Sequence, residues 1–567
     1  MKINTIYRTA AFAFLVICAG SCSKILDVKP QDTVDSTNAF QTVYDADAAI
    51  MGLYGKFMNL AASYVMLNEL RADLLTTTGS TNEDLRELNE HEVVAGNAYA
   101  NPKPYYDVIL NCNDIMANFN IMYANKKLKL DDYNERYSDV AALRCWVYLQ
   151  LGIQFGNVPY VTDPLSTVAD ANNIALMPKI DFNTLLKNLV ATMEGLPYLQ
   201  PYAAAATVNQ TVSGYSTAKF FVNKQVLLGQ LYLWTGNYHK AAIAYKAVME
   251  AGGAGDLYTN RIAYESKGDN NDIAVGYIRY KEEDLGSLVD NNSQGWRSIF
   301  ARTPDNLFNE EWIWFLPYNT SYSPQDPFID LFSNRGGSYL LKPSQLAMNN
   351  WNSQTQKNNF TFDARGPVFT YRTLDNQPVI MKYLYNYLDG TTFLPINLLT
   401  KNGKWHLYRA AALHLEYAEA ANQDNHHTIA FALLNQGLTT LPGQISTEAT
   451  PYNFDARKSD NPKITGDWCT NAGIRGRAYL FNSTTPIAAT DSTNIIEDRI
   501  INEAGLELAY EGKRWSDLVR IALRRNNPAY LANKVYNKLL LEGNPKAAAV
   551  QAKLMNPANW YLPFKWQ

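Results

Sequence analysis

The stretch QVLLGQLYLWTGNYHKAAIAYKAVMEAG, residues 225–252, decides the fold. Its apolar residues recur with helical spacing on both sides of Gly236, which predicts two consecutive helices. Gly236 permits a tight turn between them, because glycine enters left-handed backbone conformations without steric cost. Ala241 lets the two helices approach closely, and Tyr245 fills the groove between them. We therefore expect a packed helix pair at this point of the chain.

A second stretch, LYRAAALHLEYAEAANQDNHHTIAFALLNQGL at 407–438, has the same organisation in degenerate form. Glu416 and Glu419 lie in its first helix, and a polar turn precedes a second helix with Phe431 and Leu434. Both stretches resemble tetratricopeptide units, which are helix pairs that stack on one another. Because stacked pairs form a continuous scaffold, the sequence predicts a mainly α fold built on tetratricopeptide-like pairs.

The same spacing recurs along much of the chain outside these pairs. It predicts helices over 45–59, 105–122, 137–155, 220–234, 238–251, 407–421, 428–438 and 496–524. Between 256 and 400 the pattern breaks into Asn, Gly, Pro and aromatic residues, and a structureless stretch of that size is unusual unless it is functional. We predict an N-terminal helical scaffold over 37–255, an irregular loop-rich ligand-binding subdomain over 256–400 and a C-terminal helical part over 401–567.

The N-terminus has the features of an export signal. Lys2 and Arg8 precede a short apolar run over 10–19, about half of the roughly 20 residues that a membrane span requires. The small residues before Cys22 resemble a bacterial lipobox, in which the Cys is lipidated and becomes the first mature residue. We predict a lipoprotein signal peptide over 1–21 and a tether over 22–36. Ordinary signal cleavage beside an incidental Cys is the alternative.

Composition excludes two broad classes of protein. The 567 residues carry a formal charge of −4, which excludes a strongly basic nucleic-acid binder. Apolar residues make up 47% of the chain, which is too many for an intrinsically disordered protein. Cys112 and Cys145 lie in helical patterns beside apolar neighbours, so we expect small buried hydrophobic residues there rather than a disulfide or a metal site.

Enzyme motifs are absent from the sequence. There is no HExxH, no GxSxG and no zinc-type Cys/His spacing. Glu507 and Glu511 are one helical turn apart and could form an acid/base pair, but Arg514 is near enough in sequence to lower both pKa values, which favours a structural ion network. We expect no catalytic residue and no cofactor.

No segment of the sequence has the full pattern of a metal site. The adjacent His426 and His427 lie in a turn where their side chains diverge. Asp290, Asn292 and Gln294 echo a calcium loop, but Ala301 stands where the bidentate Glu belongs. We expect no metal site, with calcium in an irregular loop as the alternative.

Aromatic residues interleaved with amides are the remaining functional signal. Sugar C–H faces stack on aromatic rings while sugar hydroxyls bond amides, and extended peptides need aromatic pockets and amides for their backbone. The positions that fit this pattern best, and that we predict to contact ligand, are Trp296, Tyr99, Tyr318, Tyr322, Asn97 and Asn292. Trp312 and Trp314 alternate as on a strand, so we expect one of them to point into the core.

Several segments, taken in order, resemble the SusD/RagB family of outer-membrane nutrient-binding lipoproteins. They are CSKILDVKPQD at 22–32, NAFQTVYDADAAIMGLYGKF at 38–57, ALRCWVYLQLGIQFGNVPYVTDPL at 142–165, the helix pair with WTGNYHKAA, INEAGLELAYEGKRWSDLVR at 501–520, and the terminal NWYLPFKW. LNELRADLLTTTGSTNEDLRELNEH at 67–91 and NPKPYYDVILNCND at 101–114 look closer to the RagB-like branch. The resemblance spans essentially the whole chain after the signal.

The resemblance implies both a location and a role. It implies a lipid-anchored protein of the outer membrane, facing the cell exterior, that captures an oligosaccharide and acts as the lid of a TonB-dependent (SusC-like) transporter. An oligopeptide ligand in the same role is the alternative. A secreted glycan hydrolase and a scaffold that binds only protein are the rival hypotheses.

Overall fold

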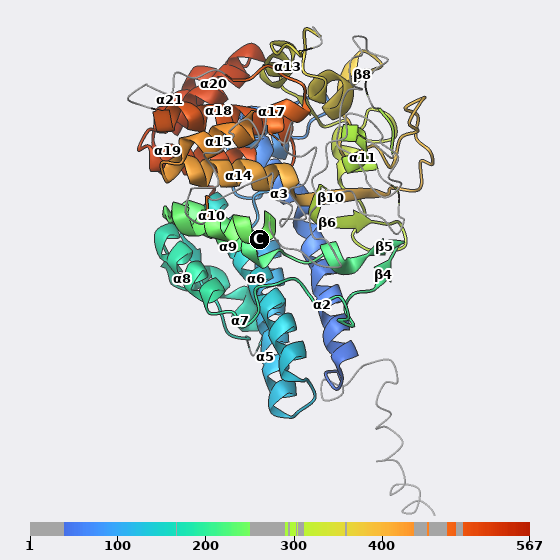
Figure 1. Ribbon diagram of the computed structural model, residues 1–567, viewed down its shortest axis with the longest axis vertical. Helices are drawn as coiled ribbons and strands as arrows, with labels where there is room; N and C mark the ends of the chain where they lie inside the picture. Colours follow the sequence, from blue (N-terminus) through green and yellow to red (C-terminus); the bar gives the residue numbers. More distant parts are fainter. Residues whose placement is uncertain are drawn as a thin grey trace, which may run out of the picture.

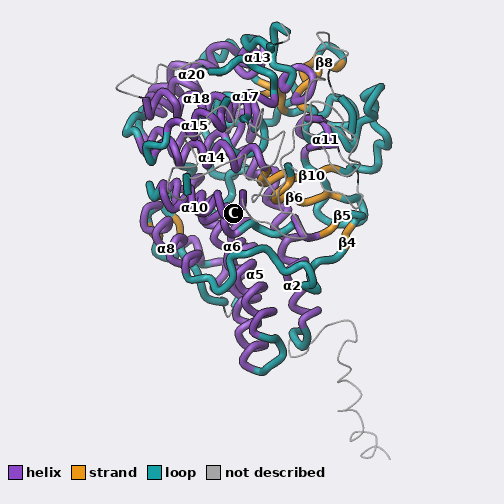
Figure 2. The backbone as a smooth tube through the Cα atoms, viewed as in Figure 1, coloured by secondary structure: helices purple, strands orange, loops and turns teal. Residues whose placement is uncertain are grey.

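The structure is a computed structural model of the 567-residue chain. It describes residues 39–566, except for 166, 250–287, 289, 293–294, 302, 304–310, 358–359, 436–450, 453–472 and 484–491. The predicted signal peptide, the tether and Cys22 lie outside the described residues. Helices dominate the described part and the strands are short (Figure 2). The prediction of a mainly α fold is confirmed.

The elements follow one another along the chain as labelled in Figure 1. The first helices are α2 (Val43–Phe57), α3 (Ala61–Glu69), α4 (Glu83–Asn89), α5 (Lys103–Ala124), α6 (Leu130–Phe155), α7 (Val168–Asn172), α8 (Phe182–Glu194), α9 (Lys224–Thr235) and α10 (Tyr238–Met249). The later helices are α11 (Gly295–Ala301), α12 (Phe328–Phe332), α13 (Gln345–Asn352), α14 (Ala410–Gln423), α15 (His427–Leu434), α17 (Ile474–Arg477), α18 (Ser492–Glu507), α19 (Arg514–Arg524), α20 (Pro528–Leu541) and α21 (Ala547–Leu554).

The described strands form antiparallel two-stranded sheets. They are β1 (Leu75–Thr77), β2 (Val158–Pro159), β3 (Lys179–Ile180), β4 (Thr211–Val212), β5 (Tyr215–Ser216), β6 (Trp312–Tyr318), β7 (Leu341–Pro343), β8 (Tyr371–Leu374), β9 (Gln377–Ile380) and β10 (Gly403–Arg409). The pairs are β1 with β7, β2 with β3, β4 with β5, β6 with β10, and β8 with β9. Two of these sheets join segments that lie far apart in the chain.

The α9–α10 pair has the predicted geometry. Asn223 caps α9 by accepting a hydrogen bond from the Val226 backbone N–H at 3.0 Å. The helix ends at Gly236, whose φ of +76° lies in the left-handed region that glycine tolerates. A Cβ atom at Gly229 would lie 2.6 Å from the Tyr245 ring, so this glycine provides the space that the ring fills. The prediction of a helix pair with Tyr245 in its groove is confirmed.

The second predicted pair is also present, as α14 and α15, and α14 packs against α10 (Figure 1). Its first helix begins later than predicted, because residues 407–409 belong to strand β10 and α14 starts at Ala410. The second helix ends at Leu434, and residues 436–438 of the predicted span lie outside the described residues. The stacked pairs therefore extend from α8 and α9 through α10 to α14 and α15.

Strand β6 is covered on both faces. It pairs with β10, and Gly403 lies opposite Tyr318. Trp312 donates to the Ile299 carbonyl at 2.7 Å, and Trp314 donates to the Phe220 carbonyl at 2.9 Å. Both indoles are buried. The prediction of one inward-pointing tryptophan was too low, because Trp312 and Trp314 are two residues apart and share one buried face of the strand. Ile313 and Phe315, on the opposite face, are buried as well.

The prediction of one continuous helix over 496–524 was wrong. The chain breaks between α18 and α19, and Tyr510 and Gly512 have φ of +71° and +81°. The buried Glu69 carboxylate of α3 accepts hydrogen bonds from the backbone N–H groups of Tyr510 and Gly512, at 3.1 and 2.8 Å, and from Lys513 at 3.0 Å. It thereby caps the start of α19.

The C-terminal segment closes the core against the first helices. The Arg71 guanidinium lies 4.1 Å from the Trp515 ring centroid and donates to the Trp560 carbonyl. The Leu562 backbone N–H donates to the Gln154 carbonyl at 2.8 Å. These contacts tie the last described residues to α3 and α6, which begin the chain's core.

The cysteines behave as predicted where they are described. Cys112 and Cys145 are buried free thiols, and burial raises the pKa of Cys145 to about 12. They act as small hydrophobic residues of the core. In the part of the chain that the structure describes, none of the helices combines the length and the apolar character needed to cross a membrane. The predicted division into domains at 37–255, 256–400 and 401–567 stays a prediction.

Candidate functional site

The predicted ligand-contacting residues occupy different environments in the structure. Trp296 lies on α11 with none of its side chain exposed. Its ring packs beneath two buried cations, with Lys382 Nζ 5.3 Å and the Arg409 guanidinium 5.1 Å from the ring centroid. A ring enclosed in this way cannot stack on a surface ligand. The structure corrects the prediction for Trp296, which is a core residue.

Tyr318 and Asn97 are likewise internal. Tyr318 is buried on β6, and its hydroxyl donates to the Met58 carbonyl. Asn97 uses its whole amide inside the protein: Nδ2 donates to the Asp84 carbonyl at 2.8 Å, and Oδ1 accepts from the Tyr99 backbone N–H at 3.1 Å. The predictions for these two residues are corrected, because their polar groups already have partners within the fold.

Tyr99, Tyr322 and Asn292 remain accessible. Tyr99 is half-buried in the turn that Asn97 organises, and burial raises its pKa. Tyr322 lies in the turn after β6 with 60% of the residue exposed. Asn292 is partly exposed ahead of α11. They come from separate segments, and their contact with ligand stays a prediction.

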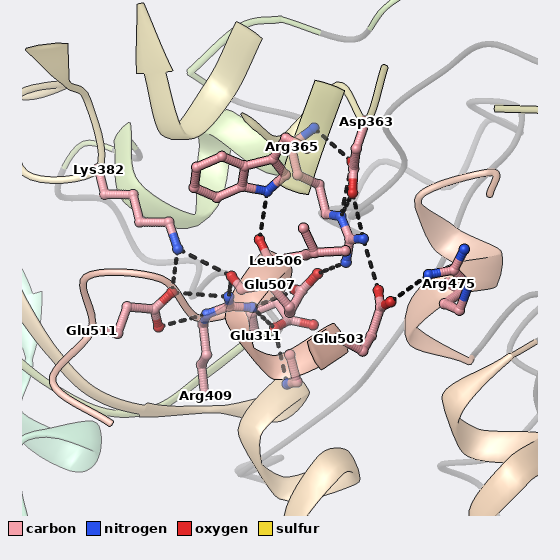
Figure 3. Close-up of polar contacts among 12 residues, drawn as sticks. Glu311, Asp363, Arg365, Lys382, Arg409, Arg475, Glu503, Leu506, Glu507 and Glu511 are labelled. Carbon is pink, nitrogen blue, oxygen red and sulfur yellow. Dashed lines mark hydrogen bonds and ion pairs between the residues drawn. The ribbon is translucent and has the colours of Figure 1, made fainter. Parts of the chain in front are cut away.

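A buried ion network joins side chains of strand β10, helix α18 and the segments around them (Figure 3). Arg409, at the end of β10, donates to Glu311 at 3.0 Å, to Glu507 at 2.9 Å and to both carboxylate oxygens of Glu511 at 2.9 and 3.0 Å. Lys382 donates to Glu511 at 2.7 Å. These side chains are buried, so each carboxylate depends on its cation for solvation.

The network continues along α18 toward the surface (Figure 3). Arg365 contacts Glu507 at 2.8 Å and Glu503 at 2.7 Å. The other oxygen of Glu503 pairs with Arg475 of α17 at 2.7 Å. Asp363 pairs with Arg365 at 2.6 Å. Consecutive turns of one helix face thus connect the buried interior to the molecular surface.

The prediction of a structural network around Glu507 and Glu511 is confirmed, but its predicted cation was wrong. Arg514 begins α19 beyond the break and pairs instead with Asp73, at 2.7 and 2.8 Å. Burial alone would raise the pKa of Glu511, but the charges of Arg409 and Lys382 hold that pKa at about 2. A carboxyl group held ionised in this way is a poor general acid near neutral pH.

No metal-binding arrangement is found among the described residues. In the segment that echoes a calcium loop, the Asp290 carboxylate binds Arg372 and lies 3.3 Å from Arg297 Nη1. The Asp290 carboxylate, which a calcium ion would need as a ligand, is therefore already paired with two guanidinium groups. Gln294, the third residue of that pattern, lies outside the described residues.

A polar cleft of about 450 Å³ opens at the outer end of the ion network. Helices α13, α18 and α20 form its walls, with α17 and the segment 482–483 at one side (Figure 1). Its polar lining residues are Asp73, Asn350, Gln354, Arg475, Asn482, Ser483, Arg499, Asn502, Glu503, Arg514, Lys534 and Asn537. Amide and cationic groups predominate. We call this the α18 cleft, and its size is within the roughly 300 to 1,000 Å³ typical of ligand sites.

The floor of the α18 cleft is held rigidly. Glu503 is fixed between Arg365 and Arg475, and Arg475 also donates to Gln354 at 3.2 Å and to the Phe481 carbonyl at 3.0 Å. These contacts fix both side chains before any ligand arrives, and preorganisation of this kind lowers the entropic cost of binding. The α18 cleft is therefore a preorganised candidate binding site.

Sequence reasoning missed the α18 cleft. Arg499, Asn502 and Asn537 are exposed and Asn350 is partly exposed, at positions of three helices where polar residues ordinarily face water. No local spacing distinguishes a solvated helix face from one wall of a cleft. The residues converge only through the packing of α13, α18 and α20.

Comparisons with known proteins agree with this architecture. The SusD family model matches residues 318–565. SusD-like protein P38 of Formosa agariphila is 22% identical over 549 residues, which cover 91% of this chain and 92% of the relative. SusD-like protein P25 of the same organism is 24% identical over 217 residues, so that match spans 39% of the relative's length.

Solved structures show the same fold along most of the chain. A SusD superfamily protein of Bacteroides vulgatus has a TM-score of 0.59 at 16% identity, covering 93% of this chain and 96% of that one. A SusD-like carbohydrate binding protein of Bacteroides fragilis has a TM-score of 0.53 at 18% identity, with coverage of 86% and 88%.

The scaffold and the comparisons define a helical protein of the SusD-like class, with tetratricopeptide-like pairs carrying an irregular region. Over residues 318–565 the chain matches the SusD/RagB family, and SusD-like relatives and structures resemble it along most of its length. Its assignment to the RagB-like branch stays a prediction.

Proposed function

We propose that the chain is a surface-exposed lipoprotein of the outer membrane that captures an oligosaccharide. It delivers this ligand to a partner TonB-dependent transporter and acts as the transporter's lid. The observation that carries the proposal is the match to SusD-like proteins along nearly the whole chain, together with a structural relative described as carbohydrate binding. An oligopeptide in the same role is the alternative ligand.

The chemistry of the α18 cleft supports capture of a hydroxyl-rich ligand. Its amide groups both donate and accept hydrogen bonds, which suits sugar hydroxyls that also do both. The carboxylates in and beneath it are paired with cations, as Glu503 is with Arg475 and Glu511 is with Arg409. Groups held in this way favour binding over turnover.

The ligand proposal is tested by calorimetry of the mature protein against a panel of glycans and peptides. Heat with glycans alone supports the proposal, and heat with peptides alone selects the alternative ligand. Release of products from a bound glycan, at a rate that survives repurification, would instead make the protein a hydrolase. No heat with either class, while a barrel partner co-purifies, would favour a scaffold that binds only protein.

The location is tested separately at Cys22, which we propose carries the lipid. Replacing Cys22 with Ala removes the acceptor thiol, so the variant should fractionate with soluble proteins while the wild type stays with the outer membrane. Because Cys22 precedes the folded core, the variant should keep the wild-type melting temperature. Membrane association of the variant would contradict the anchor.

A further inference from the structure

The α18 cleft contains cations that have no carboxylate partner among the described residues. Its two acidic lining residues are already engaged, since Asp73 pairs with Arg514 at 2.7 Å and Glu503 pairs with Arg475 at 2.7 Å. Two further cations, Arg499 of α18 and Lys534 of α20, also line the cleft. The charge of the lining is therefore unbalanced in favour of cations.

Arg499 is the more accessible of these two cations. It is exposed on α18, and it forms no hydrogen bond or ion pair with any residue that the structure describes. Its neighbour Asp498 does have a partner, because that carboxylate pairs with Arg525 at 2.9 Å. The guanidinium keeps its donor fork available for an anion with two adjacent oxygens, such as a carboxylate or a sulfate.

Lys534 lines the same cleft and is less exposed than Arg499. Its ammonium lies 3.4 Å from Asn502 Oδ1 and 5.3 Å from the Tyr530 ring centroid, and none of the described carboxylates lies within ion-pair distance of it. Burial and the nearby charge of Arg514 lower the pKa of Lys534, and the charges of Asp73 and Asp498 offset this only in part. An anion placed in the cleft would restore the solvation that this group lacks.

The rest of the cleft suits a polar ring rather than an apolar side chain. Asn350 and Asn537 have side-chain amides without a hydrogen-bond partner in the described chain. Only leucines supply large apolar contacts in the lining.

We infer that the α18 cleft binds an anionic saccharide unit, with Arg499 and Lys534 on its acidic group and the Asn side chains on its hydroxyls. The inference rests on the proposed function and specifies the ligand's chemical class. The acidic group is a uronate carboxylate or a sulfate ester, and both present the same charge to the two cations. An acidic peptide fits less well, because the cleft lacks apolar pockets for alternate side chains.

The test measures binding of the full mature chain to a panel of neutral, uronate-containing and sulfated oligosaccharides, with hexaglutamate as the peptide arm. Each acidic glycan is paired with its neutral form, made by methyl esterification of uronates or by desulfation. We expect at least one acidic glycan to bind tenfold or more tightly than its neutral form. The preference for the acidic form should weaken as the salt concentration rises. If uronate-containing glycans show the preference, the acidic group is a carboxylate, and if sulfated glycans show it, the group is a sulfate ester.

Substitutions locate the site within the protein. Arg499→Gln and Lys534→Gln should each weaken binding of the preferred acidic glycan fivefold or more and leave its neutral form within twofold. Arg499→Lys retains the charge and should recover most of the preference. Lys187→Gln is the matched control and should change nothing, since Lys187 is exposed on α8, a helix that Figure 1 shows apart from α13, α18 and α20.

The outcomes separate the two proposals. If glycans bind without preference for the acidic form, or if both Gln variants bind like the wild type, this inference is overturned while the proposed function stands. If hexaglutamate alone binds and depends on Arg499, the ligand class is wrong. If no glycan of the panel binds, the proposed function fails and the inference fails with it.

Discussion

Two regions of helix α18 use the same residue types to opposite effect. In the interior, Glu507 is matched by Arg365 and Arg409, with no water available to either charge. At the outer end, Arg499 has no such partner among the described residues, and it stands exposed in the cleft. The difference indicates that matched charges fix the position of the helix, whereas the unmatched cation is available for recognition.

The largest expected effect is at the interior end. Arg409→Met leaves Glu311, Glu507 and Glu511 without their shared cation, and breaking a buried pair in this way costs about 3–5 kcal/mol. Chemical denaturation of the variant should show a loss of unfolding free energy in that range. A loss below about 1 kcal/mol would show that the network contributes little to holding α18.

The second largest effect is expected from acid, which should reduce the stability that the buried network around Glu511 provides. The folded-state pKa of Glu511, about 2, lies below its ordinary value of 4.5, so the folded form binds fewer protons between these values. The stabilisation is complete above pH 4.5 and is lost as pH falls toward 2, amounting to roughly 3 kcal/mol for this group. Melting temperatures measured from pH 6 to 2.5 should fall, and the fall should be shallower in Glu511→Gln. Equal slopes would contradict the assignment.

An exposed ion pair provides the matched control for the interior one. Arg86 and Glu83 are 3.0 Å apart on α4, with 49% and 73% of their side chains exposed. Arg86→Met makes the same chemical change as Arg409→Met in water, so the loss of unfolding free energy should stay within about 1 kcal/mol. If Arg86→Met lost as much unfolding free energy as Arg409→Met, burial could not be the property that distinguishes the two ion pairs.

The smallest effect on stability is expected at the cleft. Arg499→Gln removes no described contact, so unfolding free energy should remain within about 0.5 kcal/mol of the wild type. Thermal and chemical denaturation both measure this. A substantial loss would show that Arg499 stabilises the fold, and the contrast between the two ends of α18 would disappear.

Sequence reasoning succeeded where the physical signals are local. The turn at Gly236 and the apolar spacing around Tyr245 both lie within one short stretch of sequence, and the structure has the helix pair that they predict. The break after α18 has no such signal. Tyr510 takes a positive φ there, although tyrosine is not a residue that predicts one, and the cap comes from Glu69, 441 residues away in the chain.

The candidate site could be predicted only in part for a related reason. Aromatic residues beside amides serve equally in a core and on a binding surface, and only distant partners decide between them. Trp296 is enclosed by Lys382 and Arg409, which arrive from other segments. The cleft residues Arg499 and Asn537 are ordinary helix-surface residues until α18 and α20 pack together.

The positions of Glu69 and Arg71 on and just after α3 have a consequence for how the protein is made. Their partners, the turn at 510–514 and the Trp560 carbonyl, lie 441 residues or more further along the chain. The contacts of these first helices therefore stay incomplete until the ribosome has added those later segments. A truncated product that stops short of Tyr510 would expose a buried acid and a buried base together, and cellular proteases should remove it.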